Sequence, residues 1–275
     1  MRDILACSTD VNVWGPGIRY AAELSAKLGA SLTGIHIAAQ IPRRAPPGTP
    51  PSVLAEFVAY AQEEVQAAMQ SGPRFAAWAR QLGVCSTHWQ VALGDPLDVL
   101  GAAGNWHDAI VIERRLETRE DTTELIGEML LSGFTCIAVP ETMYAIGRLE
   151  RIAIAFDGSP ACIRALHSAI PLLSRAAHVI LLTGKWRDLT DEPPVCRPAF
   201  DPVRHLAQHG IAVQSEALDM TGTDAGDVLL EAASRQRVDL LVTGVEGKRR
   251  LGETYLDPLP RHLLRYAGLP LCMAQ

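Results

Sequence analysis

The most constraining feature of the sequence is a set of short apolar runs that recurs in the same order in the two halves of the chain. The runs at 4–7, 30–37 and 108–112 correspond to those at 152–155, 177–184 and 239–243. Internal similarity of this kind indicates two copies of one structural unit. The 275 residues suffice for two domains of roughly 135 residues each.

The spacing between corresponding residues locates an insertion. The offset is 148 from Thr9 to Asp157 and 147 from His36 to Thr183, but 131 from Asp108 to Asp239. The first half therefore carries about 16 extra residues between its second and fourth apolar runs. They fit the proline-rich stretch 42–51 and a helical segment 52–82 that is interrupted at Gly72-Pro73, because proline removes a helical hydrogen bond.

Within each half, apolar runs alternate with longer stretches of helical period, as in βαβ units whose parallel sheet is buried on both faces. The pattern predicts an α/β protein made of two doubly wound sandwiches. The expected strands are 3–8, 31–37, 84–92, 108–112 and 134–139 in the first half, and 151–156, 178–183, 211–218, 239–243 and 270–274 in the second half.

The segment 141–150 has no core periodicity, so we place the domain boundary near 147 and predict domains 1–147 and 148–275. An apolar edge at the last strand of each half is normally covered or paired. We expect pseudo-twofold packing of the halves, an intramolecular pseudo-dimer, to cover these edges. We expect two separate sheets rather than one continuous sheet. Homodimerisation of the chain remains an open alternative.

Composition excludes several classes of function. The chain is 48% hydrophobic and 20% charged, with a formal net charge of −6 and no basic run longer than Lys248-Arg249-Arg250. A nucleic-acid-binding surface is therefore not expected. No stretch reaches the roughly 18 apolar residues of a spanning helix, and the N-terminus lacks a long apolar signal region. We expect a cytoplasmic protein that does not associate with membranes.

The cysteine and histidine spacing predicts no metal site and no disulfide. The six cysteines include no Cys-x-x-Cys pair and lie mostly in apolar segments. His205 and His209 are four residues apart on an expected helix, a spacing that can bind zinc, but no third ligand is near in the sequence. A solvated helix face is the simpler interpretation.

The opening of the second half, 153–160 followed by Arg164-Ala165-Leu166, resembles the start of a universal stress protein domain. The segments 239–244 and 261–271 add to this resemblance, which extends over essentially the whole chain. The first half matches more loosely, through 94–96, 108–112 and 136–140. The resemblance implies five-stranded parallel sheets of strand order 3-2-1-4-5 and a cytoplasmic stress-response protein of regulatory or ligand-binding type.

Nucleotide-binding members of this family have Gly-x-x-Gly after the fourth strand, then nine residues, then Gly followed by Ser or Thr. Glycines let backbone amides approach phosphate, and a helix N-terminus supplies partial positive charge. Gly244 and Gly247 match the first part, whereas Asp257 and Pro258 replace the second. Pro258 lacks an N–H donor and Asp257 adds negative charge, so these two residues fit a helix N-cap and first position better than a phosphate loop.

In the first half, Glu113 and Leu116 stand in place of the two glycines, and Thr9 stands in place of Asp157. Asp10 could replace Thr9 only with a one-residue shift. Because Glu113 and Leu116 would crowd a phosphate, we expect no nucleotide there and interpret the first half as a structural or partner-binding copy.

The resemblance and the placement of Asp157 at the carboxyl edge of the sheet predict that ATP or a related nucleotide binds in the second half. A turn-forming role of Asp157 before Gly158 is the alternative. The expected nucleotide-binding residues are Phe156, Asp157, Thr183, Gly184, Thr243, Gly244, Gly247 and Lys248.

No catalytic group of residues stands out, because Ser159 has no adjacent base and the carboxylate pairs lie on expected helix faces. We expect a non-enzyme, with slow ATP hydrolysis as an open alternative. The other class of function that fits is a scaffold that binds no nucleotide and acts through protein–protein contacts.

Overall fold

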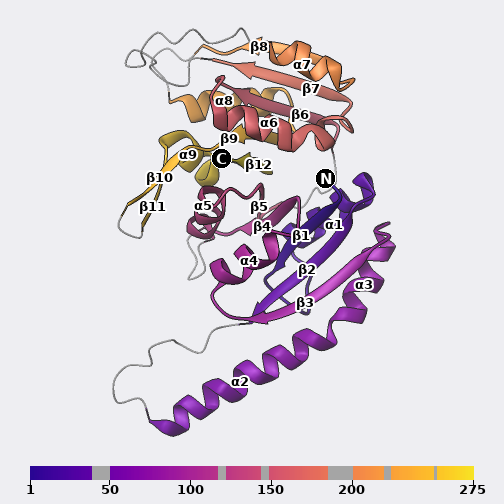
Figure 1. Cartoon of the computed structure of the whole chain (residues 1–275), viewed down its shortest axis with the longest axis vertical. Helices are drawn as coiled ribbons and strands as arrows, with labels where there is room; N and C mark the ends of the chain where they lie inside the picture. Colours follow the sequence, from indigo (N-terminus) through magenta and orange to yellow (C-terminus); the bar gives the residue numbers. More distant parts are fainter. Residues whose placement is uncertain (39–49, 117–121, 144–148, 185–200, 220–223, 251–252) are drawn as a thin grey trace.

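The computed structural model is an α/β structure built on one sheet of ten strands, in the order β3-β2-β1-β4-β5-β12-β9-β6-β7-β8 (Figure 1). It describes the chain except for residues 39–49, 117–121, 144–148, 185–200, 220–223 and 251–252. The predicted fold class is confirmed: each half has five parallel strands in the order 3-2-1-4-5, counted within that half.

The strands of the first half are β1 (Asp3–Ser8), β2 (Ser31–Ala38), β3 (Thr87–Leu93), β4 (Ala109–Arg114) and β5 (Cys136–Pro140). Its helices are α1 (Pro16–Leu28), α2 (Pro51–Gln70), α3 (Gly72–Gln81), α4 (Pro96–Gly104) and α5 (Thr123–Leu131).

The sheet strands of the second half are β6 (Arg151–Phe156), β7 (His178–Thr183), β8 (Val213–Ala217), β9 (Leu240–Gly244) and β12 (Leu271–Ala274). Its described helices are α6 (Pro160–Leu173), α7 (Pro202–Gln208), α8 (Ala225–Arg235) and α9 (Pro258–Tyr266). A separate hairpin, β10 (Gly247–Arg250) and β11 (Glu253–Leu256), follows β9.

The two five-stranded sheets are joined at β5 and β12, which pair antiparallel with Cys272 opposite Ile137. The expectation of two separate sheets is therefore wrong, although the free edges are covered as expected. The reason is physical: each half ends in a fully buried apolar strand whose backbone groups need partners, and two such edges satisfy each other directly. Antiparallel pairing of equivalent edges is the arrangement that a local twofold axis produces.

Alternating side chains of the strands build a core on each face of the sheet. Ile4 and Ala6 of β1 face the layer that contains α1, α3 and α6, whereas Leu5 faces the layer that contains α4, α5, α8 and α9. Each of these two cores extends across both halves of the chain. The period of two along the strands thus explains why the sheet has helices on both faces.

The correspondence between Asp108 and Asp239 is visible in their contacts. Asp108 accepts hydrogen bonds from the backbone N–H groups of Arg2 and Asp3, and Asp239 accepts them from Glu150 and Arg151. Burial alone would raise the pKa of Asp108, but the two backbone hydrogen bonds lower it below its usual value. In each half, this aspartate therefore fixes the start of the first strand beside the fourth.

The insertion predicted in the first half contains α2 and α3, which meet at Ser71 as the Gly72-Pro73 interruption suggests. In Figure 1, α2 runs along the outer end of the molecule, beyond β3. Most of the proline-rich stretch 42–51 lies outside the described residues, as does the boundary near 147. The division into domains 1–147 and 148–275 remains a proposal.

The hairpin β10–β11 was not predicted. It follows Gly244 and packs against α5 of the first half, where a Cβ added to Gly247 would lie 3.2 Å from Leu131 Cδ2 and 2.6 Å from the carbonyl oxygen of Tyr255. In Figure 1 the hairpin extends from α9 toward the first half. None of the described helices is long and apolar enough to cross a membrane.

Candidate functional site

A cleft of about 230 Å³ opens at the carboxyl ends of β6 and β9. Three helices begin at this cleft, because Ser159, Asp224 and Asp257, the N-cap residues of α6, α8 and α9, all line it. The other lining residues are Asp157, Ala225, Gly226, Gly244, Glu246, Pro258, Leu259 and Pro260. The carboxyl edge of a parallel sheet is the usual place for a ligand in this class of fold.

The turn after β6 shapes one wall of the cleft. Asp157 Oδ1 accepts a hydrogen bond from Ser159 N at 2.8 Å, and Gly158 between them has a φ of 77°. Ser159 Oγ in turn accepts from Cys162 N at 3.1 Å and so caps α6. Asp157 therefore has the turn-forming role, and it lines the cleft as well.

Gly244 allows β9 to approach α6 closely. A Cβ at this position would lie 2.3 Å from the backbone nitrogen of Cys162, so any larger residue would push the helix away. This contact gives Gly244 a packing reason that does not involve phosphate. A small adjoining cavity is lined by Thr243, Gly244 and Ala155 among others. Burial raises the pKa of the neighbouring Cys162 thiol to about 12, so this thiol is not a reactive nucleophile.

The charge of the cleft is negative. Asp157, Asp224, Glu246 and Asp257 line it, and no lysine or arginine is among its lining residues. The helix N-termini attract an anion, whereas the carboxylates repel one. Asp257 is the N-cap residue of α9 and Pro258 follows it at the start of the helix, as predicted from the sequence. The arrangement favours a cation, or a neutral ligand with hydrogen-bond donors, over unshielded phosphate.

The structure brings together only part of the predicted nucleotide-binding set. Asp157, Thr243 and Gly244 line the cleft or its adjoining cavity. Phe156, Thr183 and Gly184 lie at the ends of β6 and β7, outside the lining of these two cavities. Gly247 and Lys248 belong to β10, which replaces the expected loop with a hairpin directed at the first half. That these residues contact a nucleotide stays a prediction.

Sequence reasoning did not select Asp224 and Gly226, which lie beside the cleft at the start of α8. The sequence pattern that could have located them is that of a helix start: an aspartate followed by small residues before an apolar helical segment. Glu246, between Gly244 and Gly247, was not selected either. The motif covers only the residues at the ends of β6 and β9. Asp224 and Gly226 lie in the connection between β8 and β9, so the motif does not include them.

In the first half, the place that corresponds to Gly244 is occupied by a carboxylate. Glu113 is 6% exposed, and its Oε2 accepts a hydrogen bond from Gly17 N at 3.1 Å in the first turn of α1. Arg115 Nε contacts the other oxygen at 3.2 Å. The Glu113 side chain thus occupies the N-terminus of α1, where a bound anion would otherwise interact with the helix.

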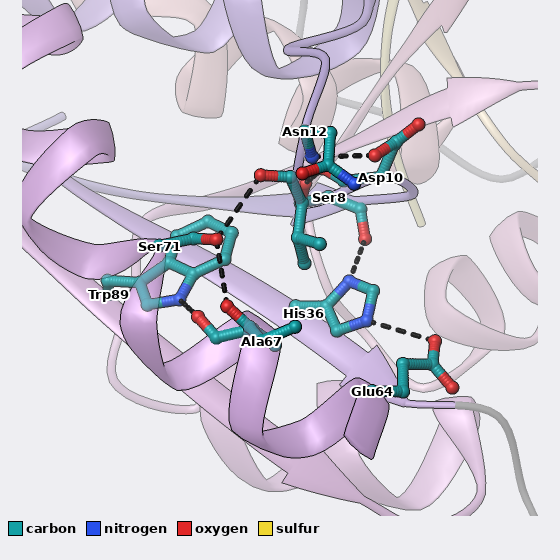
Figure 2. Close-up of polar contacts among 10 residues, drawn as sticks. Ser8, Asp10, Asn12, His36, Glu64, Ala67, Ser71 and Trp89 are labelled. Carbon is teal, nitrogen blue, oxygen red and sulfur yellow. Dashed lines mark hydrogen bonds and ion pairs between the residues drawn. The ribbon is translucent and has the colours of Figure 1, made fainter. Parts of the chain in front are cut away.

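The end of β2 in the first half is closed by a polar network (Figure 2). His36 Nδ1 lies 3.3 Å from the carbonyl oxygen of Ser8, and His36 Nε2 lies 3.3 Å from Glu64 Oε1 on α2. Asp10 Oδ1 accepts from Asn12 N at 2.6 Å, so this carboxylate is engaged with its own loop. The inserted helix α2 therefore covers the strand end that corresponds to Thr183 in the second half.

The second contact of α2 with the sheet lies beside this network (Figure 2). Trp89 Nε1 of β3 donates to the carbonyl oxygen of Ala68 at 2.7 Å, and Ser71 Oγ donates to the carbonyl oxygens of Ala67 and Val11. These bonds tie the end of α2 to the loop after β1. In the first half, side chains of the chain itself therefore lie both at the end of β2 and at the N-terminus of α1. That this half binds no nucleotide stays a prediction.

Comparison with known proteins identifies the fold. No protein-family model and no curated protein matches the sequence. Among solved structures, a universal stress protein from Archaeoglobus fulgidus matches with a TM-score of 0.69 at 12% identity, over 99% of this chain and 96% of that one. A functionally unknown protein from Pseudomonas aeruginosa matches with a TM-score of 0.56 at 12% identity, over 100% of this chain and 92% of that one. This chain has the universal stress protein fold along its whole length.

Proposed function

We propose that the protein is a cytoplasmic, non-enzymatic, ligand-binding protein of the universal stress type. In this proposal the second half receives a small molecule and the first half is a structural copy that binds none. The observation that carries the proposal is the contrast between equivalent places: Gly244 borders a cleft of about 230 Å³, whereas Glu113 fills the N-terminus of α1 with its own carboxylate.

A nucleotide such as ATP is the ligand class that we propose first, because the resemblance implies it. The N-termini of α6, α8 and α9 meet at the cleft and offer partial positive charge to phosphate. The carboxylates of Asp157, Asp224, Glu246 and Asp257 oppose it, and Pro258 contributes no N–H donor. We therefore expect binding to be weak, with a dissociation constant near the millimolar range.

The test is calorimetric titration of the full chain with ATP and magnesium, combined with a variant that fills the cleft. Ala225 lines the cleft at the first residue of α8, so Ala225→Phe should abolish the heat of binding. The matched control is Ala102→Phe on the exposed face of α4 in the first half, which should bind as the parent does. Equal loss in both variants, or undiminished binding to Ala225→Phe, would contradict the placement of the ligand.

The alternative function is a scaffold that binds no nucleotide and acts through protein–protein contacts. The acidic lining of the cleft and the Asp257-Pro258 helix start favour it, because both weaken the attraction for phosphate. The absence of any heat and of any shift in melting temperature at millimolar ATP would support the scaffold over the ligand-binding protein.

A further inference from the structure

Beside the cleft, three side chains from two helices come together. Asp224 and Asp227 lie at the start of α8, and His262 lies on α9. His262 Nδ1 is 3.5 Å from Asp224 Oδ1, and His262 Nε2 is 3.0 Å from Asp227 Oδ1. One ligand atom from each of the three residues can be chosen so that all lie within 4.8 Å of one another. This group combines two carboxylates with an imidazole.

The histidine is held in position by its surroundings. Its side chain is 17% exposed, and a Cβ at Gly226 would lie 2.3 Å from His262 Cδ2. Any residue other than glycine at 226 would therefore displace the ring from α8. The close approach of Gly226 fixes the imidazole between the two aspartates, which is the kind of orientation that a ligand side chain needs.

The nitrogen nearest Asp227 has no hydrogen bond. His262 Nε2 is buried and has no hydrogen-bond partner among the described residues, although Asp227 Oδ1 is 3.0 Å away. The two atoms are thus close without the alignment of a hydrogen bond. Neighbouring ligands on one metal ion lie roughly 3.0 to 3.5 Å apart, because each is about 2.1 Å from the ion. His262 Nε2 and Asp227 Oδ1 are therefore at a separation that two ligands of the same ion have.

The charge around the group also favours a cation. Asp224 lines the acidic cleft together with Asp157, Glu246 and Asp257. The side chains of Asp224 and Asp227 are 58% and 65% exposed, so an ion can reach them from solvent. Asp224 Oδ1 accepts a hydrogen bond from Gly226 N at 2.8 Å, which holds this carboxylate beside His262. His262 is the least exposed member and supplies the fixed ligand.

We propose that Asp224, Asp227 and His262 form a binding site for a divalent transition-metal ion such as Zn²⁺. One imidazole nitrogen and two carboxylate oxygens are a ligand set that suits Zn²⁺ better than Mg²⁺, which prefers oxygen ligands alone. Three protein ligands would leave the fourth position of a tetrahedral ion to water or another ligand. A bound ion would also offset the negative lining of the cleft, although the proposal does not depend on a nucleotide.

This site departs from the expectation that the chain has no metal ligands. The three residues were not connected in the sequence because His262 lies 35 residues beyond Asp227, on a different helix. The histidines that were considered, His205 and His209, do have a third histidine nearby: the His167 ring is 4.8 Å from that of His205. The His167 and His205 rings stack, whereas the His205 and His209 rings meet edge to face. This histidine group serves as the competing site in the test.

The experiment titrates Zn²⁺ into full-length protein that has been treated with a chelator and then freed of it. We expect one ion per chain with micromolar affinity, and at least tenfold weaker binding for Asp227→Asn and for His262→Gln. Asp227 is exposed in the first turn of α8, so Asp227→Asn should stay folded and reports on the site even if His262→Gln unfolds. Mg²⁺ at the same concentration should give no comparable heat.

Two control variants address other ligands for Zn²⁺. His209→Gln removes the exposed member of the histidine group, just after α7, and Cys85→Ser removes an exposed thiol. Both should bind Zn²⁺ as the parent does. Failure of the parent to bind, undiminished binding to Asp227→Asn, or loss of binding in either control would overturn the proposal.

Discussion

Glu113 Oε2 accepts a hydrogen bond from Gly17 N at 3.1 Å, so a side chain of β4 interacts with the N-terminus of α1. The corresponding contact in the second half is made by Gly244, whose backbone packs directly on that of α6. The contact between the end of the fourth strand and the first helix is therefore made by a carboxylate in the first half and by backbone atoms in the second half. The residue at this position differs between the halves: Glu113 occupies the N-terminus of α1, whereas Gly244 leaves the N-terminus of α6 beside a cleft.

The first prediction concerns this carboxylate. Glu113→Gln keeps an acceptor for Gly17 but removes the negative charge that interacts with Arg115 and with the helix terminus. We expect the free energy of unfolding to fall by about 1 kcal/mol, from the lost charge–dipole and ion-pair interactions. Denaturant unfolding measures this change. Glu56→Gln on the exposed face of α2 is the control, and an equal effect there would contradict a specific role for Glu113.

The second prediction concerns close packing at Gly34 of β2. A Cβ at this position would lie 2.7 Å from Trp89 Cε3 and 2.8 Å from Phe75 Cζ, inside a group of four packed aromatic rings that also includes Trp14 and Trp78. Gly34→Ala should therefore lower the free energy of unfolding by about 1 to 3 kcal/mol through overpacking.

The control for Gly34 is another glycine in the first half. A Cβ added at Gly101 of α4 would meet no atom within 4 Å, so Gly101→Ala should raise the free energy of unfolding, by about 0.5 to 1 kcal/mol. Thermal unfolding of the two variants measures both signs. A stabilising Gly34→Ala would show that the aromatic group is packed less tightly than the structure indicates.

Most of the sheet strands could be predicted because they are short apolar runs; the edge strands β3 and β8 are more polar. All ten predicted strands are present, and several, such as β6 and β7, have the predicted bounds. The break between α2 and α3 was predictable because Pro73 cannot continue a helix. These features depend on local chemistry, which a single sequence carries.

The features that were missed depend on contacts between distant residues. The pairing of β5 with β12 places Ala138 opposite Leu271, 133 positions further along the chain, and no local pattern specifies which edge covers which. The hairpin β10–β11 is polar in sequence and is held against α5 of the other half. At the candidate site, Asp157 and Gly244 were predictable from the ends of strands, whereas Asp224 and His262 come from two other connections, at the start of α8 and on α9.

The third prediction concerns a contact between the halves. Arg114 at the end of β4 is 3% exposed. Its guanidinium group donates to the carbonyl oxygen of Leu263 at 3.0 Å and also to those of Leu264 and Ala267, at the end of α9. Arg114→Met removes these donors and leaves buried carbonyl groups unpaired. We expect the free energy of unfolding to fall by about 2 to 4 kcal/mol. Arg204→Met, on the exposed face of α7, should change it little.

The fourth prediction concerns pH. Burial, and after it the neighbouring His167 and His209, lowers the pKa of His205 below its ordinary value of 6.5. The unfolded chain therefore binds a proton at higher pH than the folded chain does, and stability is lost as the pH falls through 6.5 and on through the lower folded pKa. The melting temperature should decrease over this window, and His205→Gln should reduce the decrease. A pH dependence that is unchanged in His205→Gln but reduced in the exposed control His88→Gln would exclude this origin.

The last prediction tests whether the start of α9 weakens nucleotide binding. Asp257 is the N-cap residue and Pro258 begins the helix, and both line the cleft. Asp257→Gly with Pro258→Ser removes a negative charge and restores one backbone N–H donor. ATP binding should strengthen by about 1 to 3 kcal/mol if the phosphates approach this helix terminus.

The chain supplies a control with the same residue pair at α7, where Asp201 is the N-cap residue and Pro202 begins the helix. Asp201→Gly with Pro202→Ser makes the same two changes at a terminus that does not line the cleft, and it should leave ATP binding unaltered. Calorimetric titration of both double variants gives the comparison. Because the two pairs are chemically identical, a gain confined to the α9 pair identifies that helix terminus as the phosphate-facing wall, and the absence of such a gain means that any nucleotide is held elsewhere.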